Sequence, residues 1–252
     1  MAAACLAAFL AGAINSVAGG GTLISFPVLL WLGLPSITAN ATNTVAIWPG
    51  SLGSLWGFRR ELRQTEKRIR WLSVVCLLGG LAGAVLLRRT PAAVFDRLVP
   101  FLLLFATLLF TVQDTVRKRL GTGSRATRST LGWIVFAVVF QLLVAIYGGY
   151  FGAGMSIMML TSLGILGMSD ILEMNALTSL FALCINGMAA LLFIVTGMVD
   201  WRYLLPMAAA ALAGGYGAAG VARRVGRTAV RRFVIGVGFA ISIYLFVKTF
   251  CS

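Results

Sequence analysis

Eight long apolar segments, separated by short gaps of which several are basic, constrain the fold of this chain more than any other feature. They cover residues 3–32, 37–58, 71–88, 93–113, 130–167, 171–198, 203–222 and 229–250. A helix needs about 20 residues to cross the hydrocarbon core of a bilayer. The first and fifth segments are too long for one straight crossing, and both contain glycine clusters. These lengths predict an all-α, polytopic membrane protein with about 8–10 transmembrane segments.

The composition excludes a soluble protein. Hydrophobic residues make up 60% of the chain and charged residues 11%, whereas soluble domains carry about 25% charged residues. The net charge of +14 would suggest nucleic-acid binding if it covered a soluble face. Here the basic residues lie in the gaps between apolar segments, where they orient spans and contact acidic lipids. We therefore expect the lipid bilayer, and no nucleic acid, as a partner.

The residues that most enzymes use are missing. The chain has no histidine, no GxSxG motif and no pair of carboxylates inside an apolar segment. Its four cysteines stand singly in apolar surroundings, as packed thiols do. We expect no catalytic residues, no metal and no cofactor.

The two halves of the chain resemble each other. The stretch Ala145–Ile157 (AIYGGYFGAGMSI) is similar to Ala13–Ile24 (AINSVAGGGTLI), and Asn175–Thr178 follows the second as Asn40–Asn43 follows the first. We predict a first transmembrane repeat at residues 1–113, a cytoplasmic connector at 114–129 and a second repeat at 130–252.

The charges of the gaps indicate how the two repeats are oriented. Arg59–Arg70 is strongly basic, whereas its counterpart Asp200–Arg202 is neutral; Arg88–Arg97 is mildly basic, whereas Arg223–Arg232 is strongly so. Copies with the same orientation should share this pattern, so the exchange favours inverted-topology repeats. Inversion requires an odd number of segments per half, which holds if each long segment is broken into two. Eight unbroken crossings and a parallel arrangement are the alternative.

Glycine clusters mark two points where a helix should open. Each glycine costs a helix about 1 kcal/mol relative to alanine, and in lipid a broken helix must face protein or a water-filled cavity. The N-terminus of the next helix then offers unpaired N–H groups and partial positive charge, which together bind anions. The candidate residues are Gly19, Gly20, Gly21 and Thr22 in the first half and Gly152, Gly154 and Ser156 in the second. The alternative is that these glycines serve close helix packing.

Uncharged polar side chains follow each glycine cluster. They are Asn40, Thr42 and Asn43 in the first half and Asn175 and Thr178 in the second. Such groups can donate hydrogen bonds to an oxyanion and still release it. Their alternative role is hydrogen bonding between helices, worth about 0.6–2 kcal/mol per bond. Asn15 and Asn186, inside apolar segments, are weaker candidates.

Two acidic residues precede or begin the segment near Ile171. Asp170 and Glu173 occupy positions where carboxylates commonly cap a helix or interact with its dipole. Glu173 could alternatively bind a proton for coupled transport.

At these residues the chain resembles the sulfite exporter TauE/SafE family, also called the toluene-sulfonate uptake permease family. The resemblance rests on SVAGGGTLISFPVLLWLGLPSITANATNT in the first half and YGGYFGAGMSIMMLTSLGILGMSDILEMNALTSL in the second. It implies a multi-pass carrier of the bacterial inner membrane for small anions such as sulfite, organosulfonates, thiosulfate or related carboxylates. Ala153 and Met155 stand where the family usually has glycine, which puts anion binding at the second turn in doubt.

We therefore expect a secondary transporter that works by alternating access, with its anion held between the glycine breaks. Coupling to protons or sodium stays open, because no clear buried acid supports it. A channel-like anion pore would use the same donors without alternation. A non-transporting accessory subunit of the membrane is the third alternative.

Overall fold

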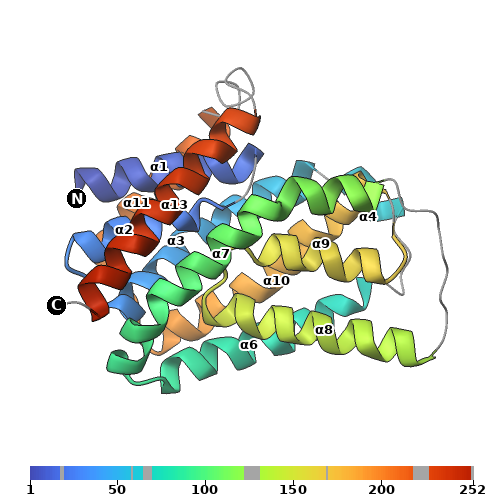
Figure 1. Cartoon of the computed structure of the whole chain (residues 1–252), viewed down its shortest axis with the longest axis horizontal. Helices are drawn as coiled ribbons and strands as arrows, with labels where there is room; N and C mark the ends of the chain where they lie inside the picture. Colours follow the sequence, from blue (N-terminus) through green and yellow to red (C-terminus); the bar gives the residue numbers. More distant parts are fainter. Residues whose placement is uncertain are drawn as a thin grey trace.

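The computed structural model describes residues 1–17, 20–57, 59–64, 70–121, 131–168, 170–217 and 227–250, and every regular element in these ranges is an α-helix (Figure 1). The helices are α1 (Ala2–Val17), α2 (Thr22–Trp31), α3 (Ser36–Gly57), α4 (Arg59–Gln64), α6 (Leu72–Arg89), α7 (Ala92–Gly121), α8 (Leu131–Tyr150), α9 (Met155–Ile165), α10 (Ile171–Val195), α11 (Trp201–Gly217) and α13 (Arg227–Phe250). The predicted all-α class is confirmed.

Both over-long apolar segments are broken where the glycines predict. The first forms α1 and α2, and Gly20 between them has φ +86°. The second forms α8 and α9, and Gly154 before α9 has φ +77°. This left-handed conformation strains any residue with a Cβ atom. With 10 and 11 residues, α2 and α9 are each roughly 15–17 Å long and reach about halfway through a bilayer core.

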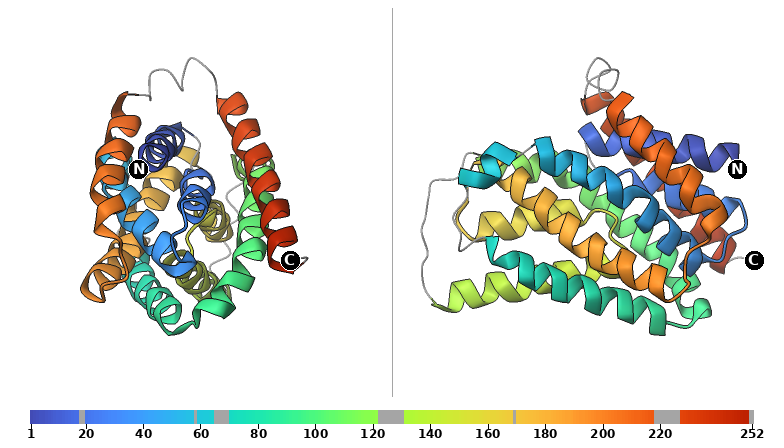
Figure 2. Two further views of the ribbon diagram at one scale, coloured as in Figure 1. Left: turned by 90° about the vertical axis from the view of Figure 1, so that its left-hand side faces the viewer. Right: turned by 180° about the vertical axis from the view of Figure 1, so that it is seen from behind.

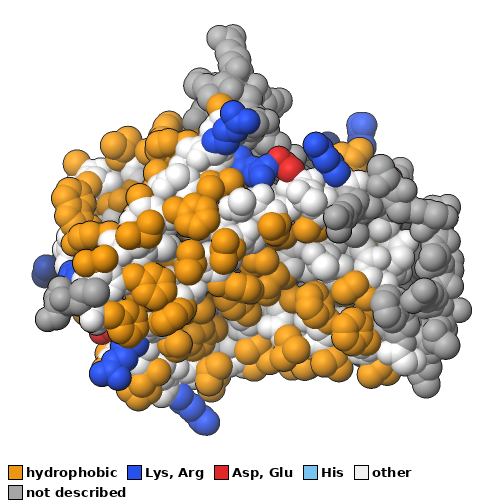
Figure 3. Space-filling view, in the orientation of Figure 1, with side chains coloured by type: hydrophobic (Ala, Val, Ile, Leu, Met, Phe, Trp, Pro, Cys, Tyr) orange, Lys and Arg blue, Asp and Glu red, His pale blue; other side chains and the backbone are white. Residues whose placement is uncertain are grey.

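Within the described residues, four helical stretches are long and apolar enough to cross a membrane: Leu72–Arg89, Ala92–Val116, Ile171–Val195 and Arg231–Phe250. Shorter apolar stretches lie at Ala2–Asn15, Thr22–Trp31, Val135–Tyr150 and Met155–Ile165. Figure 3 shows apolar side chains spread over the face that α7, α8, α9 and α13 present, with lysine and arginine gathered toward its edges. Such a surface suits lipid, and the chain is an integral, multi-pass membrane protein.

The helices of the two predicted halves are interleaved. Helix α1 packs along α11, and α6 packs along α8. Helix α10 lies between α3 and α6 in the rear view of Figure 2, and α7 lies beside α13 in Figure 1. Among the described helices, and apart from the short α4, each half has the same order: a long helix, a half-helix and three more helices. This order agrees with the predicted duplication, while inversion of the two halves stays a prediction.

Glycines allow the interleaved helices to approach closely. A Cβ atom on Gly83 of α6 would meet the Ile146 carbonyl of α8 and would lie 2.8 Å from the Tyr150 nitrogen. A Cβ atom on Gly214 of α11 would likewise meet the carbonyl of Phe9 on α1. At these two contacts glycine serves backbone packing, as small residues commonly do in membrane helices.

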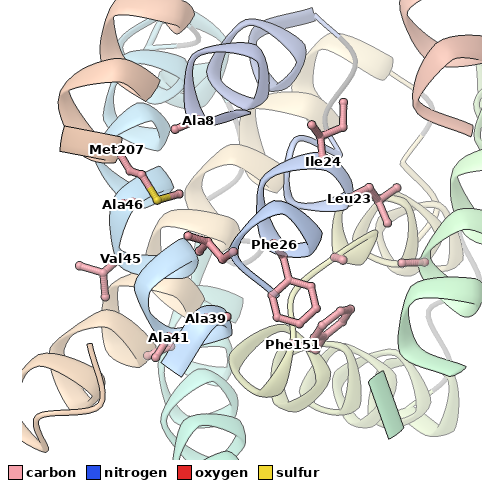
Figure 4. Close-up of a cluster of buried hydrophobic side chains, with 14 of the residues drawn as sticks. Ala8, Leu23, Ile24, Phe26, Ala39, Ala41, Val45, Ala46, Phe151 and Met207 are labelled. Atoms are coloured by element: carbon pink, nitrogen blue, oxygen red, sulfur yellow. The ribbon is translucent and has the colours of Figure 1, made fainter. Parts of the chain in front are cut away.

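The buried centre joins the two half-helix regions. In Figure 4 the ring of Phe26 from α2 faces the ring of Phe151 at the α8–α9 break, and their centroids are 5.4 Å apart in an edge-to-face arrangement. Alanines of α3 lie close by, and Met207 of α11 borders the same cluster. The core therefore fixes α2 against the second glycine break.

Two features differ in detail from the expected segments. The basic gap after α3 contains a short helix, α4, which apolar periodicity does not predict. Helix α7 continues to Gly121, so the described part of the predicted connector is helical and residues 122–129 lie outside the described ranges.

Candidate functional site

The amino end of α2 is closed by a side chain from α1. Thr22 begins the helix, and Gly19 lies outside the described residues. The Gly21 N–H donates to Oδ1 of Asn15 over 2.8 Å, and the Leu23 N–H donates to the Gly20 carbonyl over 3.0 Å. A Cβ atom on Gly21 would meet the Ala11 carbonyl of α1. Part of the predicted N–H array is therefore already hydrogen-bonded within the protein.

We expect Asn15→Ala to lower the free energy of unfolding by about 1 kcal/mol, as loss of a capping side chain typically does. The reason is that the buried Gly21 N–H loses its acceptor. Thermal unfolding in detergent measures the change. Thr161→Ala is the control, because its hydroxyl donates only to Ile157 within the same helix, and its loss should be smaller. Equal losses in the two variants would contradict the capping role.

The amino end of α9 has no side-chain cap. Gly152 and Gly154 both have positive φ, +79° and +77°, and no side chain bonds at the N-cap position of Gly154. Ile157 N–H donates to the Gly154 carbonyl over 3.2 Å. Ser156, in the first turn, is half-buried. The Met155 N–H also donates to the Gly152 carbonyl over 3.3 Å. Among the described residues, no side chain closes this end as Asn15 closes that of α2.

Helix α7 brings the two glycine turns together. A Cβ atom on Gly20 would lie 2.7 Å from the ring of Phe110, and one on Gly154 would lie 3.3 Å from Cα of Ala106. Ala106 and Phe110 are four residues apart on α7, so they share one face and are separated by about 6 Å of helical rise. The two half-helices therefore begin close to each other, against one covering helix.

The polar cluster of α3 is almost fully buried. Asn40 and Asn43 are each 1% exposed, and Thr42 is fully buried. Asn40 donates from Nδ2 to the Tyr150 carbonyl at the end of α8 over 3.0 Å. Among the described residues, neither polar atom of the Asn43 side chain has a hydrogen-bond partner. A buried amide without partners is rare in native proteins and calls for an explanation such as a ligand.

Thr42 has a structural contact. Its Oγ1 accepts a hydrogen bond from the Asp200 N–H over 2.9 Å, which ties α3 to the start of α11. This is the interhelical bonding that the sequence left open as the alternative role.

The polar cluster of α10 occupies matching helix positions but different surroundings. Asn175 and Thr178 lie as far from the first residue of α10 as Asn40 and Asn43 lie from that of α3. Asn175 is half-buried, whereas Thr178 is 7% exposed and its buried hydroxyl has no hydrogen-bond partner. Their neighbours on α10 pack in an apolar cluster with Met155, Met159 and Leu163 of α9.

Asp170 caps α10, as the sequence predicts. Its Oδ1 accepts from the N–H groups of Leu172 (2.8 Å) and Glu173 (3.3 Å). The Glu173 side chain is half-buried in the first turn, and its role in coupling stays a prediction.

The sequence does not predict that an arginine of α13 contacts α7, the helix that covers the glycine turns. Arg231 of α13 is paired with Asp114 and donates to the carbonyls of Phe110 (3.2 Å) and Thr111 (2.8 Å) on α7. Its side chain is 15% exposed. Arg231 belongs to the basic gap Arg223–Arg232, whose charge indicates only how the neighbouring spans are oriented in the membrane. Nothing in the spacing of this gap predicts a contact with Phe110.

Comparison with known proteins shows a match to one family model and to several relatives. The model described as sulfite exporter TauE/SafE matches residues 4–245. A probable membrane transporter protein of Haemophilus influenzae is 28% identical over 92% of this chain and 88% of its own length. A probable membrane transporter protein of a Sinorhizobium species is 26% identical over 95% and 90%, and one of Escherichia coli K12, YfcA, is 29% identical over 77% and 70%. No solved structure matches the chain.

Proposed function

Because the chain belongs to the sulfite exporter TauE/SafE family of membrane transporters, we propose that it carries small anions across the bacterial inner membrane by alternating access. The proposed cargo is sulfite, thiosulfate, an organosulfonate or a related carboxylate. We place the anion between the glycine breaks, at the amino end of α9 and beside Asn43.

The observation that carries this proposal is the Asn43 side chain. It is 1% exposed and none of its hydrogen-bonding capacity is used. A neutral amide supplies two N–H donors, and it avoids the high cost of a lysine or arginine buried in lipid. An oxyanion that accepts these hydrogen bonds removes the cost of the unpaired N–H donors of Asn43, which is about 1–3 kcal/mol.

Two further features support an anion at this place. The uncapped amino end of α9 contributes partial positive charge without a full charge. The two half-helices begin against neighbouring turns of α7, so both can contribute to one site. The residues proposed to bind the anion are Asn43, Gly154 and Ser156, with Gly20, Gly21 and Thr22 of α2 on the other side and Asn40 adjacent.

Alternating access is proposed to arise from relative motion, about this site, of helix groups that each contain helices of both halves. Interleaved pairs such as α1–α11 and α6–α8 would move as units, because their glycine contacts permit little sliding. The excess of positive charge in the gaps would raise the local concentration of anions at the cytoplasmic mouth.

A flux experiment tests the function. Purified protein in liposomes should take up labelled sulfite, thiosulfate or methanesulfonate with saturating kinetics, and unlabelled anion inside should drive counterflow. Protein-free liposomes are the control. Fast, non-saturating flux without counterflow would indicate the anion pore instead. No flux with any of these anions or with acetate would contradict the proposal and favour the accessory subunit.

A further inference from the structure

The side chain of Asn43 leaves two kinds of hydrogen-bonding group unused, and a simple anion suits only one of them. Asn43 is 1% exposed, and neither Nδ2 nor Oδ1 has a partner among the described residues. Nδ2 carries two N–H donors, whereas Oδ1 can only accept. Because both atoms are unpaired, this holds for either orientation of the amide. An anion whose oxygens only accept pairs with Nδ2 and leaves Oδ1 buried without a donor.

Asn40 presents a second unpaired oxygen on α3. Its Nδ2 donates to the Tyr150 carbonyl over 3.0 Å, and its Oδ1 is buried without a partner in the described part of the chain. The Tyr150 carbonyl can only accept, so it must face the nitrogen of this amide. Asn40 and Asn43 are three residues apart and are therefore neighbours on the helix surface. Together the two buried amides leave two acceptor oxygens and one donor nitrogen unsatisfied.

The buried polar side chains limit the charge of a ligand as well. Among the described residues they are serine, threonine, asparagine and glutamine, all of which are neutral. The Born cost of moving an ion out of water rises with the square of its charge, so a dianion costs about four times as much as a monoanion of the same size. A site built from neutral donors offsets only part of that cost. It therefore suits a monoanion better than a dianion.

We propose that the cargo is a small monoanion that carries its own O–H group beside its charged oxygens. A charged oxygen accepts from Asn43 Nδ2, and the O–H donates to Oδ1 of the same amide, with Asn40 Oδ1 as a neighbouring acceptor. Glycolate, hydroxyalkanesulfonates and the O-protonated form of bisulfite belong to this class, whereas acetate, methanesulfonate and thiosulfate do not. This inference rests on the proposed transport function and narrows its cargo.

The hydroxyl should discriminate between ligands because the site itself rejects an anion that lacks it. Without the O–H, the amide oxygen of Asn43 stays buried without a donor, and sites built to hydrogen-bond a substrate group reject analogues that lack the group. A site without an unpaired acceptor would give the opposite result, because burial of an additional unpaired hydroxyl weakens binding. The sign of the hydroxyl effect therefore tests the proposal.

Pairs of anions with equal charge measure this effect on the purified full chain in detergent. Thermal unfolding is followed at fixed pH and ionic strength with glycolate against acetate, and with isethionate (2-hydroxyethanesulfonate) against ethanesulfonate. A ligand of the folded state raises the unfolding temperature with increasing concentration. The half-saturating concentration should be at least tenfold lower for the hydroxylated member of each pair. Equal or reversed values within both pairs would overturn the proposal.

Variants assign the preference to Asn43. Asn43→Leu should bring the two members of each pair to within twofold of each other. Gln141→Met is the matched control, because Gln141 Oε1 is another buried oxygen without a partner among the described residues and its Nε2 donates to Cys76 Sγ over 3.2 Å. The control should keep the preference. If Asn43→Leu does not fold, Asn43→Ala replaces it, since it also removes both polar atoms. A preference that survives at Asn43 or disappears in both variants would overturn the proposal.

Uptake by liposomes separates this proposal from the transport function. Saturating uptake of acetate and methanesulfonate as efficient as that of glycolate and isethionate would leave transport standing and refute the hydroxyl requirement. Preferential binding of glycolate in detergent, without uptake of any of these anions, would refute transport and leave recognition by Asn43 standing.

Discussion

Replacing Asn43 with leucine should raise the free energy of unfolding by about 1–3 kcal/mol and reduce anion flux to the level of protein-free liposomes. Leucine has the branched outline of asparagine with bulkier methyl groups, and it removes two buried polar atoms that have no partner among the described residues. Removing a buried polar atom that has no partner raises the free energy of unfolding by about 1–3 kcal/mol. Repacking around the leucine side chain reduces this gain in stability. The same change deletes the donors proposed to hold the anion.

Chemical unfolding in mixed micelles and uptake by liposomes measure the two effects. Ser242→Ala is the matched control, because this fully buried hydroxyl of α13 already donates to the Gly238 carbonyl. It should leave flux intact and change stability little. If Asn43→Leu lost stability together with flux, the amide would have a structural partner and the binding role would be refuted. Retained flux would refute it as well.

Replacing Gly83 with leucine should destabilise the protein by about 3 kcal/mol or more, the upper end of overpacking in a close-packed core. A Cβ atom there would collide with the Ile146 carbonyl and approach the Tyr150 nitrogen to 2.8 Å, so α6 and α8 would have to separate. Gly236→Leu is the control, because a Cβ atom on this glycine of α13 meets nothing within 4 Å.

The control should be neutral or stabilising by up to about 1 kcal/mol, since glycine is a poor helix former. Unfolding in detergent distinguishes the two variants. A Gly83→Leu protein as stable as Gly236→Leu would show that α6 and α8 do not pack backbone to backbone.

Sequence alone predicted the features that depend on local chemistry. Apolar length and glycine density gave the all-α class and the breaks before α2 and α9, and carboxylate position gave the Asp170 cap. These features follow from the helix propensities of the local residues and from the lipid that surrounds the chain. Duplication and inversion depend on comparing weak patterns, and they stay predictions.

What sequence could not predict are contacts between distant parts of the chain. Asn40 and Asn43 look alike in the sequence, yet only Asn40 finds a carbonyl, and that carbonyl is 110 residues away. The position of Phe110 over Gly20 likewise depends on how α7 crosses the molecule.

The pairing of α1 with α11 also affects how the protein is made. Helix α1 ends at Val17, and α11, which packs against the Gly12 face of α1, does not begin until Trp201. At about 5–20 residues per second, a ribosome needs roughly 10–40 s to complete that interval. During that time the glycine-bearing face of α1 is lined only by lipid or by an insertion factor. The newly synthesised chain must therefore reach its native arrangement by late docking of its earliest helix.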